Sequence, residues 1–276
     1  MDLLAPGGPV AEQAAAAGIR VERDGRRLTV TLARPDRRNA MTPATWRALA
    51  AVGDAVPGSD VAVVVLRAEG PSFSAGLDRG MFGEGTDGEP GLARLAALPP
   101  AEIDAAIAGF QRGFSWWREV DAVSIAAVGG HAVGGGFQLA LACDLRVLAD
   151  DAALAMREPS LGIVPDLGGT SPLVRTVGYS RALEICATGR WVGAQEAAAL
   201  GLAEVVVARA ELDAAVDDLA GALLAAPQGA LAATKHLLAG ALDRSPVDQR
   251  AAERAAQVPL LRRQLGGHLG RHPDGS

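Results

Sequence analysis

The sequence predicts an α/β fold in which a strand-containing core is followed by a helical region. An apolar, β-branched run at residues 123–128 leads through glycines 134–136 into a helical pattern, as at the junction of a buried strand with a helix. Strand patterns at 19–23 and 28–33 flank an Asp-Gly pair, which predicts an antiparallel hairpin. From about residue 210 to 265 the pattern is almost entirely helical.

The remaining elements follow from local signals. Thr42 stands before Pro43 and a helical pattern that runs to about residue 56, so Thr42 is the predicted N-cap. The β-branched run at 61–67 is typical of a strand buried on both faces. Helical periodicity returns at 101–119. Short strands are expected at 145–148, 152–156 and 204–207.

These signals divide the chain into four parts. We expect a flexible N-terminal arm at 1–17, a core at 18–208, a helical C-terminal region at 209–265 and a disordered tail at 266–276. Within the core, the glycines, prolines and charges of residues 79–100 indicate a mobile segment that could serve as a lid or a pocket wall.

Composition excludes several classes of protein. The 276 residues carry 26 Lys+Arg against 32 Asp+Glu without a basic block, which argues against a nucleic-acid partner. Cys143 and Cys186 have no metal or redox spacing, and the four histidines have no ligand spacing either, so no metal is expected. No apolar run reaches about 18 residues and no leader pattern is present, which predicts a cytoplasmic protein without a membrane partner.

Three loops are candidates for chemistry: residues 73–78, 130–138 and 158–170. The first two follow buried strands and offer backbone N–H groups, as two donors converging on one oxygen would require. The glycines at the helix start suit an anion, although a tight turn would carry the same glycines. Phosphate-loop, dinucleotide and nucleophile-elbow motifs are absent from the sequence.

Taken together, the motifs in these loops resemble the crotonase, or enoyl-CoA hydratase/isomerase, superfamily. The matching stretches are residues 73–78, 125–144, 161–170, 188–190 and 197–202. The resemblance implies a spiral of ββα turns with a C-terminal helical trimerisation region, and therefore a homotrimer or a dimer of trimers. It also implies acyl-CoA thioester substrates, with coenzyme A as part of the substrate and no other cofactor.

The resemblance also implies where the thioester binds. The backbone N–H groups of Leu77 and Gly135 would form an oxyanion hole for the thioester oxygen. Arg34, Ala75 and Asp78 would contact coenzyme A, Ala75 at the adenine. A surface role for Arg34 beside proline remains an alternative.

The acid/base positions combine a match with a departure. Glu158 stands where the second hydratase glutamate is found, whereas Gln138 stands in place of the first. An amide orients a group but does not shuttle protons near neutral pH. Asp166 falls on a position that resembles an acidic site of dienoyl-CoA isomerases. A surface role for Glu158 and a turn-forming role for Asp166 remain alternatives.

The sequence thus predicts an acyl-CoA-processing enzyme of hydratase/isomerase type, with Glu158 as acid/base and Gln138 as an orienting group. One carboxylate suffices to move a double bond, so isomerisation is favoured. Hydration with Asp166 as second acid, thioester hydrolysis and decarboxylation remain open, as does a non-catalytic acyl-CoA-binding protein. The acyl group is not predicted.

Overall fold

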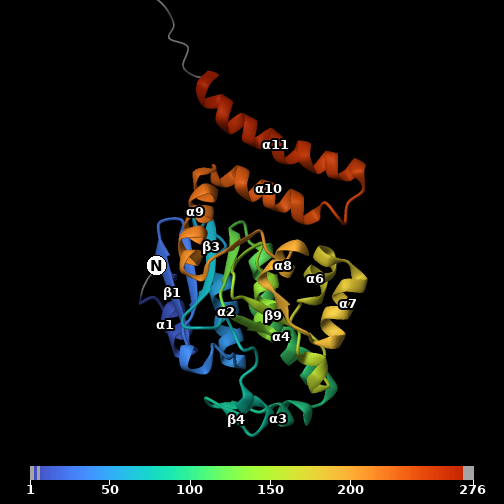
Figure 1. Cartoon of the computed structure of the whole chain (residues 1–276). Coiled ribbons are helices and arrows are strands. Elements are labelled where there is room, and N and C mark those ends of the chain that lie inside the picture. The colour runs from blue at the N-terminus through green and yellow to red at the C-terminus, as the bar shows by residue number, and fades with distance from the viewer. Residues whose placement is uncertain (1–2, 5–6, 270–276) are drawn as a thin grey trace, which may run out of the picture.

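The computed structural model describes residues 3–4 and 7–269, and a six-stranded sheet lies at its centre (Figure 1). The strand order is β1-β2-β3-β6-β8-β11. Its strands are β1 Ile19–Asp24, β2 Arg27–Leu32, β3 Val63–Ala68, β6 Val123–Val128, β8 Leu145–Ala149 and β11 Val205–Val207. The β1–β2 hairpin is antiparallel, as the Asp-Gly turn predicted, and the other neighbours are parallel.

Helices cover both faces of this sheet. Val64 and Leu66 of β3 belong to the main core, with the helices α2 (Pro43–Ala55) and α4 (Pro100–Glu119). Val63 and Val65, on the opposite face of β3, pack in a second core with α9 (Leu212–Ala225). Burial on both faces explains why this strand begins with four consecutive large apolar residues, Val63 to Leu66.

A smaller sheet in the order β10-β9-β7 stands beside the first. Its strands are β7 His131–Val133, β9 Ala153–Ala155 and β10 Val192–Gly193. The chain enters β7 from β6 and β9 from β8, both strands of the large sheet, whereas β10 follows the helix α7 (Tyr179–Thr188). A helical segment follows each of the three small strands. The first of these helices, α5 (Gly135–Ala142), begins directly after β7 and is buried along its whole length.

Short elements complete the core. They are the 3-10 helices η1 Pro35–Arg37, η2 Arg79–Phe82, η3 Glu158–Leu161 and η4 Arg209–Glu211, the hairpin β4 Gly85–Thr86 with β5 Glu89–Pro90, and the helices α3 Leu92–Ala96, α6 Thr170–Val177, α7 Tyr179–Thr188 and α8 Ala194–Ala199. The hairpin and α3 hang below the sheet in Figure 1 and occupy the segment predicted as a lid or pocket wall.

The N-terminal segment differs from the loose arm predicted for residues 1–17. Residues Pro9–Ala16 form the helix α1, with Pro9 at its first position. Ala14 is fully buried, and α1 packs against α2 and β1. Alanine side chains allow this close packing without the periodic large apolar residues that mark a helix in a sequence.

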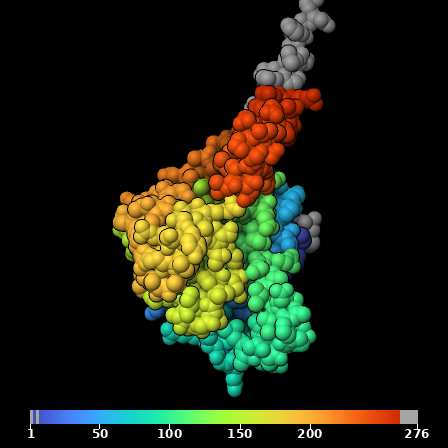
Figure 2. All heavy atoms as spheres, turned by 90° about the vertical axis from the view of Figure 1, so that its right-hand side faces the viewer, coloured from blue at the N-terminus to red at the C-terminus, as the bar shows by residue number. Residues whose placement is uncertain are grey.

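The C-terminal region consists of α9, α10 (Gln228–Gly240) and α11 (Pro246–Leu269), with breaks at Pro227 and before Pro246, while Pro259 lies inside α11. Helix α11 packs on α10 and stands out from the body of the molecule (Figure 2). The predicted disordered tail began at residue 266. Residues 266–269 continue α11, and 270–276 lie outside the described residues.

Candidate active site

The glycine-rich loop before α5 packs directly against the loop after β3. Ser74 N–H donates to the carbonyl of His131 over 2.9 Å, and Val133 N–H donates to the carbonyl of Ser74 over 2.9 Å. Gly76 has a φ of 83°, and a Cβ atom added to it would lie 2.5 Å from the carbonyl oxygen of Val133. Only glycine fits this crossing. The structure therefore brings together the first two loops that the sequence singled out.

Two backbone N–H groups are unpaired where these loops meet. Met41 N–H donates to the Gly76 carbonyl over 2.7 Å and Asp78 N–H to the Met41 carbonyl over 2.8 Å, while Leu77 N–H has no partner among the described residues. Gly135 begins α5, where a helix leaves its N–H groups unpaired. Because a Cβ atom on Gly76 would lie 3.5 Å from the nitrogen of Gly135, the second donor is next to the first loop.

A cavity of about 100 Å³ is lined by Leu77 and Gly135. Three of the predicted catalytic side chains, Gln138, Glu158 and Asp166, line the same cavity. The remaining lining is mostly apolar and includes Trp46, Phe82, Val133, Leu161, Ile163 and Leu167. Donors for a developing oxyanion and ionisable groups for proton transfer thus share one small, largely apolar space.

Glu158 is held by one carboxylate oxygen only. Glu158 is buried, with 6% of its surface exposed, and its Oε1 accepts a hydrogen bond of 2.7 Å from Nε2 of Gln138. Oε2 is buried without a partner in the part of the chain that the structure describes. A Cβ atom on Gly134 would come within 3.1 Å of Oε1, so this glycine makes room for the carboxylate. One oxygen is therefore positioned by Gln138, and the other keeps its capacity for a hydrogen bond or a proton.

Gln138 is the group that holds Glu158 in place. Its Oε1 accepts hydrogen bonds from the backbone N–H of Leu167, over 2.9 Å, and of Gly169, over 3.2 Å. Only the carbonyl end of the amide accepts hydrogen bonds, so these two contacts turn its NH₂ group toward Glu158. Gln138 therefore acts as an orienting group and links Glu158 to the loop that follows it.

The cavity shifts the proton affinity of both carboxyl groups upward. Burial raises the pKa of Glu158, and the charge of Asp166 raises it further, while the hydrogen bond from Gln138 acts in the opposite direction. Burial also raises the pKa of Asp166. A carboxyl group with a raised pKa both takes and returns a proton more readily near neutral pH.

A second cavity, of about 530 Å³, adjoins the first. Ala75, Leu77 and Val133 line both. The second cavity also carries three arginines without an ion-pair partner among the described residues, Arg37, Arg38 and Arg79. Unpaired guanidinium groups favour a phosphate-bearing ligand.

The loop that carries two of these arginines has a conformation that side-chain residues seldom adopt. Arg38 and Asn39 have φ values of 50° and 52°. Asn39 holds the loop, because its Oδ1 accepts from Arg34 N–H over 2.8 Å and its Nδ2 donates to the carbonyls of Glu69 and Ser72, each over 2.8 Å. Such backbone conformations cost about 1–3 kcal/mol each and concentrate at binding sites.

The three residues that the resemblance assigned to coenzyme A occupy different surroundings. Ala75 lines the arginine-bearing cavity. Asp78 is buried and lines it too, and its Oδ1 accepts from Gly80 N–H over 3.0 Å. Arg34 is engaged within the protein, since its guanidinium donates to Asp87 over 2.6 Å and to the carbonyl of Ala40 over 3.0 Å.

Sequence reasoning missed an aromatic residue in the second cavity. Trp191 is 43% exposed, the guanidinium carbon of Arg157 lies 5.0 Å from its ring centroid, and the ring of His131 lies 5.1 Å away. The three residues are far apart in sequence, and an exposed tryptophan after a helix is the only local signal. The adjacent arginines at 37 and 38 are a stronger local signal for this cavity.

The described residues contain neither a metal-ligating cluster nor a membrane-spanning helix. Within residues 3–4 and 7–269, no group of three or more metal-ligating side chains is found. In the same part of the chain, no helix combines the length and the hydropathy needed to cross a membrane.

Comparison with known proteins identifies the family of this chain. The family model for enoyl-CoA hydratase/isomerase matches residues 27–264. The chain belongs to the enoyl-CoA hydratase/isomerase family. Its relatives include a Mycobacterium tuberculosis protein named a probable enoyl-CoA hydratase, EchA17, which is 33% identical over 230 residues and 83% of both chains.

Solved structures agree with this membership. A Thermobifida fusca protein, provisionally named an enoyl-CoA hydratase and solved with acetoacetyl-CoA, is 53% identical, with a TM-score of 0.88 over 92% of this chain and 98% of that one. A Thermobifida fusca protein of the same description, solved with CoA, is 50% identical, with a TM-score of 0.87 over 96% of this chain and 98% of that one. The crotonase-like fold predicted from the motifs is confirmed.

Proposed function

We propose that this member of the family catalyses double-bond isomerisation of enoyl-CoA thioesters with Glu158 as its single acid/base. The observation that carries the proposal is the contact between Gln138 and Glu158. An amide takes the place of the first carboxylate of the two-glutamate hydratases, and it binds the remaining carboxylate. The site then has one positioned proton carrier beside two unpaired N–H donors.

The reaction requires one proton to move between two carbons. The unpartnered Oε2 of Glu158 removes a proton from C2 of a 3-enoyl thioester, and the electron pair spreads into a dienolate. The N–H groups of Leu77 and Gly135 donate to the enolate oxygen, which costs little reorganisation because the backbone already holds them. The same carboxyl group returns the proton to C4, which completes the 2-enoyl thioester without a second acid.

The arginine-bearing cavity provides the place for the coenzyme. The two cavities adjoin, because Ala75 and Leu77 line both. A ligand whose phosphates bind in this cavity can therefore extend into the reaction cavity. The Thermobifida fusca complexes with CoA and acetoacetyl-CoA support CoA thioesters as the ligand class. We expect Arg37, Arg38 and Arg79 to contact the phosphates, and Arg34 to act indirectly through the loop it supports.

Hydration is the second candidate, and Asp166 favours it. Its carboxyl group lines the reaction cavity and has a raised pKa, as a second acid would need. The relatives named as hydratases also favour it. Against it stands Gln138, which occupies a position where the two-glutamate route uses a carboxylate.

The test is turnover of trans-2-, cis-3- and trans-3-enoyl-CoA by the wild type, Glu158→Gln and Gln138→Glu. We expect the wild type to interconvert the 3- and 2-enoyl esters, and Glu158→Gln to lose at least about 10²-fold in kcat. Gln138→Glu should gain hydration, because it restores the second carboxylate. Asp166→Asn separates the two candidates. Hydration that uses Asp166 as the second acid should be abolished in this variant, whereas isomerisation by Glu158 alone should stay largely intact.

Three results would contradict the proposal. Wild-type hydration without isomerisation would establish the second candidate. Release of free CoA or CO₂ from the ester panel would indicate thioester hydrolysis or decarboxylation. Binding of CoA esters without turnover by any variant would leave a non-catalytic acyl-CoA-binding protein.

A further inference from the structure

A third cavity, of about 1040 Å³, opens from the reaction cavity on another side. Trp46 and Leu77 line both cavities, so the two are continuous. Its volume is about ten times that of the reaction cavity and reaches the upper end of the range for small-molecule sites, about 300–1,000 Å³. The segment from η2 to α3 forms one wall and α4 the other.

Charge distinguishes the two large cavities that meet at Leu77. The cavity of about 530 Å³ is lined by three arginines and two aspartates. The larger cavity is lined by two arginines and three acidic residues, of which Glu89 is paired with Arg47 and Asp87 with Arg34. Phosphates are therefore favoured in the first cavity and disfavoured in the second. The second is left for the acyl part of the substrate.

Large apolar side chains form the inner surface of this cavity. Trp46 and Phe110 lie with ring centroids 5.0 Å apart beside the reaction cavity. Other apolar side chains line it further along, among them Met81, Leu92, Leu95 and Leu98. Such a lining stabilises an alkyl chain and offers few hydrogen bonds to a polar one.

The outer wall is fastened to the core by side chains from two directions. Arg34, which follows β2, donates to Asp87 over 2.6 Å at the tip of the β4–β5 hairpin. Arg47 of α2 pairs with Glu89 on the other strand of the hairpin. Two contacts of this kind hold the hairpin over the cavity.

Most of the α4 residues that line this cavity have small side chains or none; Phe110 is the large one. Ala105 and Ala106 line the cavity, and so does Gly109, which lies about one turn further along the helix. A Cβ atom added to Gly109 would meet nothing within 4 Å. The room available to a ligand along this wall therefore depends on the absence of side chains at these positions.

We propose that the enzyme acts on CoA thioesters of long, apolar enoyl chains, and that Gly109 together with Ala105 and Ala106 determines the chain length accepted. This inference rests on the proposed enoyl-CoA chemistry and adds the substrate class. Each methylene group buried should improve kcat/KM about fourfold until the cavity is full.

The experiment measures kcat/KM for a series of enoyl-CoA esters lengthened two carbons at a time, with wild type, Gly109→Leu and Ala108→Leu. Gly109→Leu projects a side chain into the empty space, and it should lower kcat/KM at least about tenfold for the longest esters while leaving the shortest unchanged. Leucine also favours a helix over glycine, so this variant should fold at least as well as the wild type. Ala108 is exposed on the same helix outside the cavity lining, so Ala108→Leu is the matched control and should match the wild type at every length.

Two outcomes would overturn the proposal: a wild-type kcat/KM that does not rise with chain length, or a Gly109→Leu effect that is equal at all lengths. Failure of the underlying chemistry would look different, because no ester would then be turned over. In that case calorimetric binding of the same esters decides. Affinity that rises with chain length in the wild type and not in Gly109→Leu would support the cavity assignment, and affinity independent of length would refute it.

Discussion

Glu158 and Lys235 are both buried ionisable groups, yet their surroundings differ in kind. Glu158 has one hydrogen-bonded oxygen and one without a partner among the described residues. Lys235 is 8% exposed, and its ammonium contacts three acceptors, the carbonyl of Trp117 at 2.9 Å, the carbonyl of Ala122 at 2.6 Å and Asp144 Oδ2 at 2.9 Å. Burial favours the neutral form of each group, so it raises the pKa of Glu158 and lowers the pKa of Lys235.

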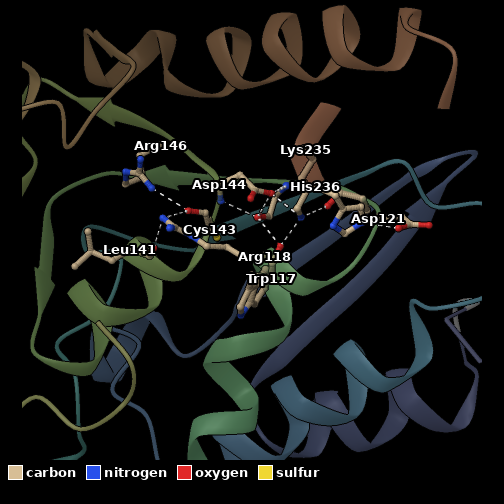
Figure 3. A network of polar contacts seen from close by, with 11 residues as sticks. Trp117, Arg118, Asp121, Leu141, Cys143, Asp144, Arg146, Lys235 and His236 are labelled. Atoms are coloured by element: carbon tan, nitrogen blue, oxygen red, sulfur yellow. Dashed lines mark hydrogen bonds and ion pairs between the residues drawn. The ribbon is translucent and has the colours of Figure 1, made fainter. Parts of the chain in front are cut away.

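The Lys235 network joins α10 to the core (Figure 3). Lys235 points down from α10 toward the end of α4 and toward Asp144, which precedes β8. Asp144 in turn accepts hydrogen bonds from the backbone N–H of Ser124, over 2.8 Å, and from its hydroxyl, over 2.9 Å. Lys235 is the only lysine in the sequence, among 25 arginines. An ammonium suits three acceptors converging on one point better than the planar fork of arginine does.

The two buried groups differ in the hydrogen-bonding capacity that they have left. All three N–H bonds of the Lys235 ammonium have an acceptor, so this charge holds two parts of the chain in register and has no capacity left for a ligand. Glu158 lines the reaction cavity, and its buried Oε2 has no partner among the described residues, so it has capacity left for a proton. Removal of the two charges should therefore change the stability of the protein in opposite directions.

The largest effect is expected for Lys235→Met. The change leaves Asp144 and two backbone carbonyls without their cation, and breaking a buried ion pair from one side typically costs about 3–5 kcal/mol. Urea unfolding should therefore show a much lower midpoint with little change in slope. An unchanged midpoint would mean that the network contributes nothing to stability.

Lys235→Arg is the control that keeps the charge. The larger guanidinium does not fit a pocket closed by three short contacts, and overpacking costs about 1–3 kcal/mol. Full stability in this variant would show that charge alone matters, not the geometry of the ammonium.

Asp144→Asn should have an intermediate effect, a loss of about 1–3 kcal/mol. Asparagine keeps an oxygen for the hydroxyl and N–H of Ser124, but it removes the negative charge that favours the ammonium form of Lys235. The pKa of Lys235 should fall further. The loss in this variant should be smaller than in Lys235→Met at neutral pH, as measured by urea unfolding of both proteins, and a larger loss would contradict the assignment of Lys235 as the principal contact.

The sequence predicted what depends on short stretches of chain. The glycine loops, the β1–β2 hairpin, the doubly buried β3 and the departure at Gln138 were all apparent from neighbouring residues. The partners of Gln138 were not, because Leu167 and Gly169 approach it only through the fold. Lys235 gave no signal at all, since its three acceptors, Trp117, Ala122 and Asp144, lie far earlier in the chain.

Arg34 also has a partner that its neighbouring residues do not reveal. An arginine beside a proline in a polar loop suited a phosphate, and nothing local revealed that Asp87 would accept a hydrogen bond of 2.6 Å from its guanidinium. The helix α1 was missed because alanine gives no periodic signal. In each case the missing information is tertiary contact, which a single sequence does not display.

The smallest effect, and one of opposite sign, is expected for Glu158→Gln. Because the pKa of Glu158 is raised in the fold, the folded protein holds its proton above the ordinary value of about 4.3, and stability falls as the pH rises through the raised pKa. Glutamine removes this penalty and keeps an oxygen for the amide of Gln138. The variant should melt at a higher temperature than the wild type at about pH 7.5, and the difference should vanish near pH 4. A lower melting temperature at both pH values would show that the carboxylate stabilises the fold, and the contrast with Lys235 would then not hold.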